Sequence, residues 1–193
     1  MLMQEILLGH FMKKLKNLLL ILGTFIPCLS FAQNIILDGY KDLKFGMTYQ
    51  QVADSKLCTG WEYYQPLNSY KCQHFLFNGN NREATAYFNG QVLNSIAIDI
   101  LNYSQNRPPF PREVQEVKDI LNGLPQKYGP PTKVVCGADY ARSNEECNIN
   151  TTDINFDDYW MVEFLNGQIR LVNSVNQWVI LVYSSAKTIL DSL

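Results

Sequence analysis

Residues 83–101 of this chain read EATAYFNGQVLNSIAIDIL, in which two runs of alternating apolar and polar residues flank Asn89-Gly90. Alternation with a period of two is typical of a β-strand that is buried on one face. An Asn-Gly pair between two such runs is a strong hairpin signal, because both residues of a type I′ turn need a positive φ. We therefore predict strands at 83–88 and 91–101, joined by a tight turn.

The chain before this hairpin predicts another strand and a short helix. The strand spans residues 70–77 and ends at Asn78-Gly79. Thr48 and Gln51 have the spacing of a capping box, in which each side chain accepts a hydrogen bond from the backbone of the other residue. This motif predicts a helix at 49–56.

The chain after the hairpin predicts one longer helix and a second group of strands. Residues 106–111 are rich in proline, and from Arg112 onward apolar residues recur at helical spacing. Gly123 and Pro125 weaken the end of this helix, and Gly129 terminates it. Further strands are predicted at 132–137, 146–157, 159–165, 168–173 and 177–184, with a second tight turn at Asn166-Gly167.

Each half of the chain therefore has the order α-β-β-β. This order predicts an α+β fold, with an antiparallel sheet and the helices packed on one face. The halves span 38–105 and 106–193, and no linker divides residues 33–193, which we expect to form a single domain. Sequence identity between the halves is too low to prove a duplication, so a tandem repeat and an unrepeated domain both stay open.

Residues 12–32 have the layout of a secretory signal peptide. Three lysines precede a short apolar run, and small residues precede the predicted cleavage site between Ala32 and Gln33. The run is shorter than the roughly 20 residues that a membrane-spanning helix needs, so we expect a cleaved leader rather than an anchor. Residues 1–11 lack these features, and we expect translation to start at Met12. The protein is then periplasmic or secreted.

Four cysteines remain after the leader, and an even number in an exported protein indicates disulfide bonds. Short loops favour the pairs Cys58–Cys72 and Cys136–Cys147, while the two other connectivities stay open. A zinc site is not favoured, because such sites use closely spaced pairs of the type C-x₂-C.

Net charge argues against one class of partner. Residues 33–193 contain 13 Lys and Arg against 17 Asp and Glu, a formal charge of −4. A mildly acidic domain lacks the basic surface that binds phosphate backbones, so we do not expect nucleic acid as a partner. After the leader, no apolar segment is long enough to span a membrane, and we expect none of the remaining chain to do so.

No local motif indicates catalysis, a metal site or a cofactor. His74 is the only histidine after the leader, and G-x-S-x-G, P-loop and G-x-G-x-x-G motifs are absent. The segment 153–158 begins like a calcium loop but has Asp158 where the sharp turn needs glycine. We therefore predict a protein that is not an enzyme. Paired-carboxylate chemistry stays an alternative, with candidates Asp139, Glu145, Glu146, Asp153, Asp157, Asp158 and Glu163.

Aromatic residues are dense between Cys58 and Cys72, where a disulfide would hold a loop. Tyrosine and tryptophan are favoured interface anchors, because they bring a large contact area at a low cost in entropy. The predicted binding residues are Trp61, Tyr63, Tyr64 and Tyr70, with Phe110 in the proline-rich loop as a second contact. The alternative is that these rings cap the core beneath a long loop.

Two stretches resemble bacterial envelope proteins. Residues 43–52, LKFGMTYQQV, resemble the helix start of the SmpA/OmlA (BamE-like) family of outer-membrane assembly lipoproteins, and a similar start occurs in folds like the β-lactamase inhibitor protein. Residues 121–131 resemble the L-x-x-K-Y-G-x-P helix end of secreted proteins of Gram-negative bacteria. The chain lacks the lipobox cysteine of the assembly lipoproteins. The resemblance implies a fold whose members mostly bind other proteins.

These observations together predict a non-catalytic, soluble periplasmic protein-binding module of the inhibitor or immunity type. Its expected partner is another envelope or secreted protein. Two alternatives stay open. One is a structural envelope factor of the outer-membrane assembly type, and the other is a small secreted hydrolase that uses paired carboxylates.

Overall fold

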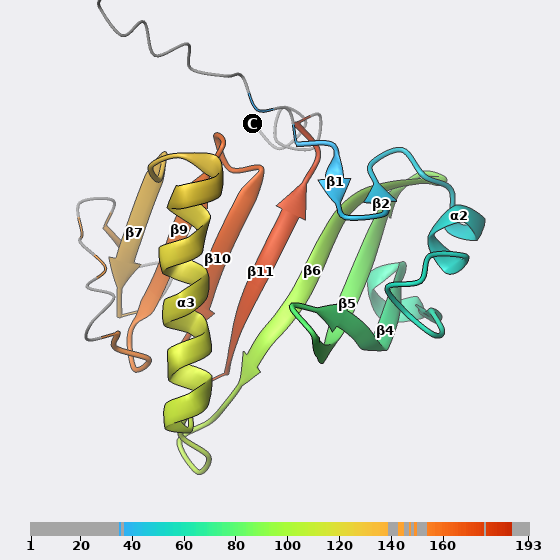
Figure 1. The fold of residues 1–193 in the computed structure, drawn as a ribbon. Helices are drawn as coiled ribbons and strands as arrows, with labels where there is room; N and C mark the ends of the chain where they lie inside the picture. The colour runs from blue at the N-terminus through green and yellow to red at the C-terminus, as the bar shows by residue number, and fades with distance from the viewer. Residues whose placement is uncertain are drawn as a thin grey trace, which may run out of the picture. The chain divides into compact units, whose positions relative to one another are not determined.

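The fold is built on one large antiparallel sheet. The computed structural model describes residues 35, 37–138, 143–144, 147, 149, 154–175 and 177–186. The strands of this sheet are β3 (Glu62–Tyr64), β4 (Ser69–Phe77), β5 (Asn80–Asn89), β6 (Val92–Asn102), β7 (Lys133–Gly137), β8 (Ser143–Asn144), β9 (Tyr159–Phe164), β10 (Ile169–Ser174) and β11 (Trp178–Ser184). Their order is β3-β4-β5-β6-β11-β10-β9-β7-β8, and every neighbouring pair is antiparallel (Figure 1). The prediction of an α+β fold with an antiparallel sheet is confirmed.

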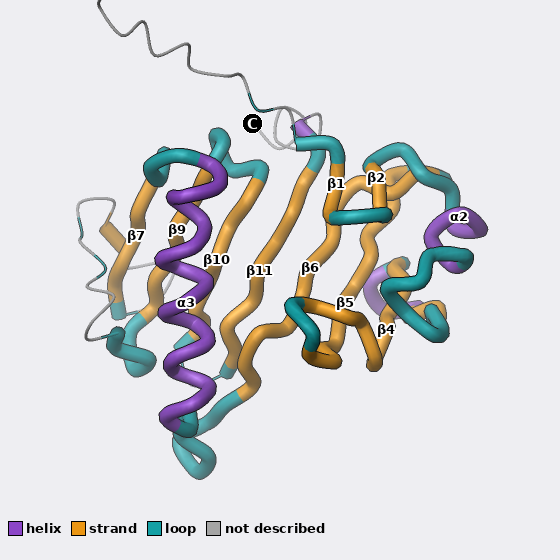
Figure 2. The backbone as a smooth tube through the Cα atoms, in the orientation of Figure 1, coloured by secondary structure: helices purple, strands orange, loops and turns teal. Residues whose placement is uncertain are grey.

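The sheet consists of two sets of strands that meet at its centre. β3 to β6 follow one another in space as they do in the chain, and β9 to β11 do the same from the other side. The last strands of the two sets, β6 and β11, lie side by side, with pairs from Ser95↔Ser184 to Asn102↔Trp178. A helix precedes each set (Figure 2). The first set lies within residues 62–102 and the second within residues 159–184.

The three Asn-Gly pairs expected at strand ends form three different connections. Asn78-Gly79 ends the strand as predicted, and it forms a two-residue turn with both φ values positive. In the next hairpin Asn89 pairs with Val92, so the turn residues are Gly90 and Gln91 instead. Glycine at the first turn position is the pattern of a type II′ turn, which needs a positive φ only there. Asn166-Gly167 lies within a four-residue loop, because the flanking strands pair at Phe164↔Ile169.

The short helix α2 (Tyr49–Ala53) begins at the predicted capping box. The Thr48 N–H donates to Gln51 Oε1 at 2.8 Å, and the Gln51 N–H donates to Thr48 Oγ1 at 3.4 Å. The helix ends three residues earlier than predicted. Val52 is its one buried residue, so little packing is available to extend it.

The long helix α3 (Pro111–Tyr128) continues through Gly123 and Pro125, beyond the predicted weak point. Proline removes one backbone donor near the end of the helix, but Leu124 and Tyr128 are buried on either side of it. Packing therefore outweighs the local break. The helix contacts β6 and β9 and crosses the second set of strands in Figure 1. Its buried face consists of Val117, Ile120, Leu121, Leu124 and Tyr128.

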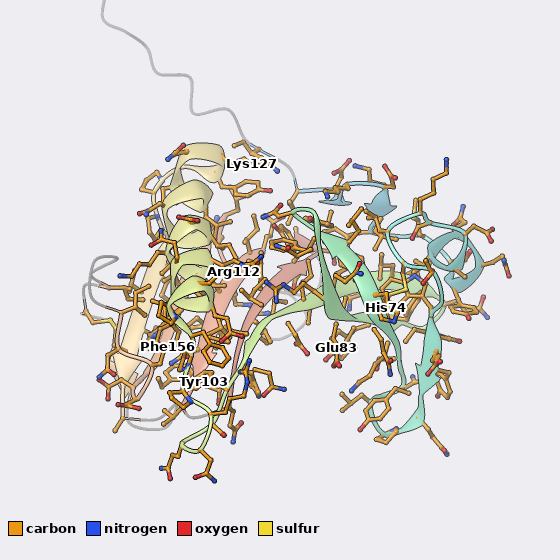
Figure 3. All side chains as sticks on the ribbon, turned by 60° about the horizontal axis from the view of Figure 1, so that its bottom comes forward. His74, Glu83, Tyr103, Arg112, Lys127 and Phe156 are labelled. Carbon is orange, nitrogen blue, oxygen red and sulfur yellow. A yellow bond between two sulfur atoms is a disulfide. The ribbon has the colours of Figure 1, made fainter. Side chains whose placement is uncertain are left out.

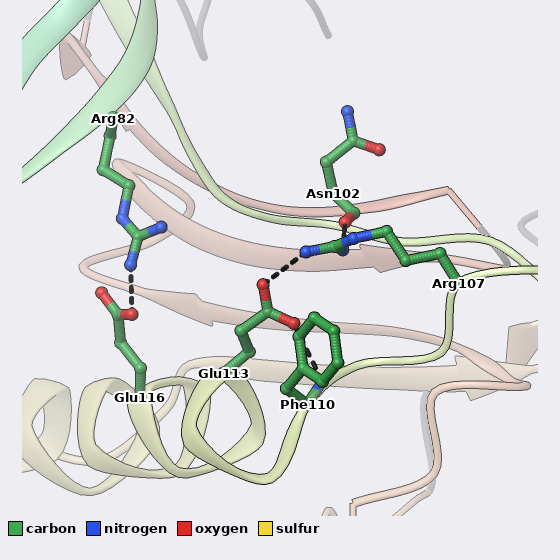
Figure 4. Close-up of polar contacts among 6 residues, drawn as sticks. All are labelled: Arg82, Asn102, Arg107, Phe110, Glu113 and Glu116. Atoms are coloured by element: carbon green, nitrogen blue, oxygen red, sulfur yellow. Dashed lines mark hydrogen bonds and ion pairs between the residues drawn. The ribbon is translucent and has the colours of Figure 1, made fainter.

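Two ion pairs fix the start of α3 (Figure 4). Glu113 accepts a hydrogen bond from the Phe110 N–H at 2.9 Å and pairs with Arg107 at 2.7 Å, which ties the helix to the preceding loop. Glu116, one turn further on, pairs with Arg82 of β5. The second pair connects the helix to the first set of strands.

A buried polar cluster holds the segment before β9 against the end of β10. The hydroxyl of Tyr103 lies 2.7 Å from Asn173 Oδ1 and 2.8 Å from the carbonyl oxygen of Phe156. The side-chain amide of Asn173 donates to the carbonyl oxygen of Asp158 at 2.6 Å. Tyr103 and Asn173 are both buried, and Figure 3 shows Tyr103 beside Phe156. Side-chain hydrogen bonds thus replace a strand ladder in this segment.

Both predicted disulfides are present, Cys58–Cys72 and Cys136–Cys147. Disulfides are typical of proteins that fold in oxidising compartments. Within the described residues, no helix is both long enough and apolar enough to cross a membrane.

Some elements were missed or misassigned. A small hairpin of β1 (Gly39–Tyr40) and β2 (Leu43–Lys44), the edge strand β3 and the 3₁₀ turn η1 (Gln65–Leu67) were not predicted, because each contains only two or three residues. The predicted strand at 146–157 is wrong at residues 154–157, which form no strand, and most of its remainder lies outside the described residues. The leader at 1–32 also lies outside them.

Replacing Tyr103 with phenylalanine tests the buried cluster. The ring is kept while buried oxygen atoms lose a hydrogen-bond donor, so we expect the free energy of unfolding to fall by about 1–3 kcal/mol. Urea denaturation measures this change. The control is Tyr49→Phe, whose hydroxyl makes one hydrogen bond of 3.4 Å to the carbonyl oxygen of Trp61, and which we expect to change stability by less than about 0.5 kcal/mol. Equal losses in the two variants would contradict the proposed role of Tyr103.

Candidate functional site

The candidate site is a cluster of aromatic rings at the β3 edge of the sheet. Tyr63 of β3 is 55% exposed, and its ring centroid lies 5.2 Å from that of Tyr70 on β4. Tyr70 also stacks on Tyr49 of α2 at 3.8 Å and meets Phe88 of β5 edge-on at 5.4 Å. We call Tyr49, Tyr63, Tyr64, Tyr70 and Phe88 the aromatic edge. Three of the predicted binding residues, Tyr63, Tyr64 and Tyr70, lie in it.

Local structure holds the aromatic edge in place. The Cys58–Cys72 disulfide closes the segment that contains β3 and η1. Asn68, with a positive φ of 45°, turns the chain from η1 into β4. Its side-chain oxygen accepts a hydrogen bond from the Tyr63 hydroxyl at 2.8 Å. The most exposed ring of the cluster is therefore tied to its own turn.

A hollow lies on each side of β3. One has a volume of about 300 Å³ and is lined by Tyr49, Tyr63 and Tyr70, among others. The other, of about 240 Å³, is lined by Tyr64, Lys71 and neighbouring polar residues of β4 and β5. The Lys71 ammonium sits 4.1 Å from the centroid of the Tyr64 ring. Tyr64 lines only the second hollow, whereas Tyr63 lies between the two and lines both.

The backbone of β3 is itself a feature of the site. β3 is the first strand in the sheet order, and within the described part of the chain its only partner strand is β4. An edge strand presents backbone N–H and C=O groups that another extended chain can pair with. All three residues of β3, Glu62–Tyr64, are exposed.

The prediction that Trp61 is a binding residue is corrected by the structure. Trp61 is only 7% exposed and meets Phe75 of β4 edge-on, with ring centroids 6.0 Å apart. It lies one residue before β3, where the chain leaves the core. Burial of so large an apolar surface stabilises the fold, so Trp61 supports the segment from beneath.

Phe110 is exposed but lies apart from the aromatic edge. It is 59% exposed and precedes α3, where the Arg107 guanidinium lies 5.4 Å from its ring centroid. Within the described residues no ring contact connects it with the tyrosines of β3 and β4. The structure therefore places Phe110 on a different surface.

The residues of the paired-carboxylate alternative are not brought together where they are described. Asp157 and Asp158 precede β9, while Glu163 lies near the opposite end of that strand. Asp139, Glu145, Glu146 and Asp153 lie outside the described residues. His74 is exposed in an irregular part of β4 (Figure 3). Among the residues that the structure describes, no group of three or more His, Cys, Asp or Glu is placed to hold a metal ion.

One carboxyl group of the sheet has a shifted pKa. Burial on β6 raises the pKa of Asp99, and the negative charge of Glu83 raises it further, while Lys71 lowers it. The folded state therefore holds this proton more tightly than the unfolded state does. The resulting destabilisation is fully present above the raised folded pKa and disappears as the pH falls toward the unfolded pKa.

Asp99→Asn tests this effect. We expect the variant to be more stable than the wild type at about pH 7 and to lose that advantage at about pH 3, where the aspartate is protonated in both states. Thermal unfolding as a function of pH measures the difference. The control is Asp42→Asn, which removes an aspartate charge at an exposed turn and shows how much of any gain comes from the change in net charge alone. A gain for Asp99→Asn that is the same at both pH values would contradict the assignment.

Comparison with known proteins gives a family but no activity. The uncharacterized protein PM0314 of Pasteurella multocida (strain Pm70) is 31% identical over 110 residues, which are 52% of this chain and 51% of the relative. The chain thus spans about half the length of the curated relative it matches. No solved structure matches.

A family described as "Uncharacterised protein" matches residues 40–192, which include both sets of strands. Neither this family nor the Pasteurella relative points to the SmpA/OmlA family or to the β-lactamase inhibitor protein, and neither names a catalytic activity. The chain belongs to this uncharacterised family.

Proposed function

We propose that this chain is an exported, non-catalytic protein-binding module that holds a segment of another envelope or secreted protein at β3. The observation that carries the proposal is the exposure of two adjacent tyrosines, Tyr63 and Tyr64, on an edge strand closed by a disulfide. Exposed Leu67 in η1 extends the same surface. Tyrosine side chains at such a position give large contact area with few rotatable bonds.

The edge position suggests how the partner binds. An extended segment that pairs with β3 gains main-chain hydrogen bonds, and its side chains alternate between the two faces of the sheet. The hollows beside Tyr63 and Tyr64 lie on these two faces and would receive alternate side chains. Affinity then comes from the backbone and specificity from the hollows.

The rigidity of the segment favours the inhibitor or immunity type of module. The disulfide and the Tyr63–Asn68 hydrogen bond order this segment before a partner arrives. Less conformational entropy is then lost on binding, which favours a tight complex. The two disulfides also support export to the periplasm or the outside of the cell.

We further propose that α2 and α3 pack on the same face of the sheet. Support comes from Val52 of α2 and Val117 of α3, which are fully buried in one continuous core cluster. In this arrangement the helices stabilise the sheet and β3 stays accessible at its edge.

The double variant Tyr63→Ala/Tyr64→Ala tests the proposed function. The oxidised protein is used to capture its partner from envelope extract, the partner is identified by mass spectrometry, and the affinity is then measured with both proteins purified. We expect the double variant to bind at least about tenfold more weakly, because central tyrosines are frequent hot spots. Its melting temperature should stay close to that of the wild type.

The matched control is Leu76→Ala, which removes an exposed apolar side chain of β4 outside the aromatic edge. It should bind as the wild type does. A double variant that folds and binds with unchanged affinity would remove β3 as the site. A separate Phe110→Ala variant tests the second predicted contact, and a loss confined to Phe110→Ala would move the interface to the start of α3.

A further inference from the structure

A second site lies away from the aromatic edge, in a cleft between α3 and the β4–β5 hairpin. The cleft has a volume of about 460 Å³, within the range of small-molecule sites. Ile120 and Leu124 of α3 form one wall, Phe77 and Asn78 of the hairpin form the opposite wall, and Tyr40 and Tyr183 lie between them. We call it the α3 cleft. It shares no lining residue with the hollows beside β3.

A strained glycine places Tyr40 in this cleft. Gly39 has a φ of +146°, and a Cβ there would lie 1.9 Å from the carbonyl oxygen of Leu43. Only glycine permits this tight β1–β2 hairpin, which brings the Tyr40 ring to 5.1 Å from Tyr183 and 5.8 Å from Phe77. The ion pair between Arg82 and Glu116 spans the same two elements as the cleft walls (Figure 4).

Two polar atoms of the cleft residues have no hydrogen-bond partner among the residues that the structure describes. Tyr40 is only 8% exposed, and its hydroxyl makes no hydrogen bond. Glu116 keeps one carboxylate oxygen, Oε1, buried and without a hydrogen bond. Burying such groups unpaired costs about 1–3 kcal/mol each, and folded proteins rarely leave them so. Burial raises the pKa of Tyr40 to about 12, which keeps the hydroxyl neutral at every physiological pH. A neutral phenol can donate one hydrogen bond.

Gly123 gives independent support for an occupant. It lies inside α3, where glycine costs about 1 kcal/mol relative to alanine. Packing does not require it, because a Cβ at this position would meet no atom within 4 Å. Gly123 lines the cleft and is itself exposed, so the absence of a side chain keeps the opening wide.

We propose that the α3 cleft binds a neutral, polyhydroxylated small molecule of the mono- or disaccharide class. The cleft lining carries two lysines, Lys41 and Lys127, and two acids, Glu116 and Asp119, and Glu116 is also paired with Arg82. No large net charge therefore favours a strongly charged ligand. The carboxylate and amide groups can each bond two neighbouring hydroxyl groups. The aromatic rings between the walls offer an apolar surface for the C–H groups of a sugar ring.

Titration of the oxidised full chain with glucose, N-acetylglucosamine and maltose tests this site by NMR and calorimetry. At least one sugar should saturate with a dissociation constant on the order of 1 mM or lower. Tyr40→Phe should weaken that binding about fivefold, the effect of one hydrogen bond. Its melting temperature without sugar should stay equal or rise, because the variant removes a buried hydroxyl that has no partner. Tyr63→Phe, which removes a hydroxyl at the aromatic edge, is the control and should bind sugar normally.

A pair of variants at Gly123 gives a second readout. Gly123→Leu places a large side chain at the opening and should reduce sugar binding by about tenfold or more, while Gly123→Ala adds only a methyl group and should reduce it much less. No saturation by any of the three sugars, or unchanged binding in both Tyr40→Phe and Gly123→Leu, would overturn the proposal. Saturation by inorganic phosphate or spermidine in place of the sugars would overturn it as well. Loss of partner capture through Tyr63 and Tyr64 leaves this result unaffected, because the two sites share no residue.

Discussion

The pairing of β6 with β11 is the contact on which the rest of the structure depends. Each set of strands could form its own hairpins, but among the described strands only this pair joins the two sets into one sheet. A row of core residues crosses the junction, with Ile98 opposite Leu181, Leu181 opposite Leu171, and Leu171 opposite Val162. The core cluster that includes this row also contains residues of α3 and of the β1–β2 hairpin. Both proposed sites therefore rest on a single continuous core.

Local chemistry explains how much of this fold could be predicted from the sequence. Alternating strands, the capping box and the short cysteine loops depend on residues close in the chain, and these predictions are confirmed. The turn of the β5–β6 hairpin lies one residue later than predicted, because an Asn-Gly pair is compatible with a type II′ turn that begins at Gly90 as well as with a type I′ turn. The helix α3 passed Pro125 because the burial of Leu124 and Tyr128, which no local pattern reports, outweighs one lost hydrogen bond.

The two sites differ in how visible they were in the sequence. Tyr63 and Tyr64 could be predicted because aromatic residues are frequent in the segment between Cys58 and Cys72. The burial of Trp61 could not, because it depends on contact with Phe75 of β4. The α3 cleft left no sequence signal, since its lining comes from five separate elements, β1, β4, β5, α3 and β11. Gly123, a glycine inside the predicted helix, is the one feature of the sequence that could have indicated the cleft. A surface on one strand is thus easier to predict than a cavity between several elements.

The central place of β11 also affects how the chain folds. It is the last described strand in the chain, yet it occupies the middle of the sheet, and its partner β6 lies far back in the sequence. Contacts between such distant segments form slowly, because a long stretch of chain must be ordered first. Because a chain is synthesised from its N-terminus, the sheet cannot be completed until residues 178–184 have been made. The topology thereby makes the insertion of β11 between β6 and β10 a late step, after the other described strands have been synthesised.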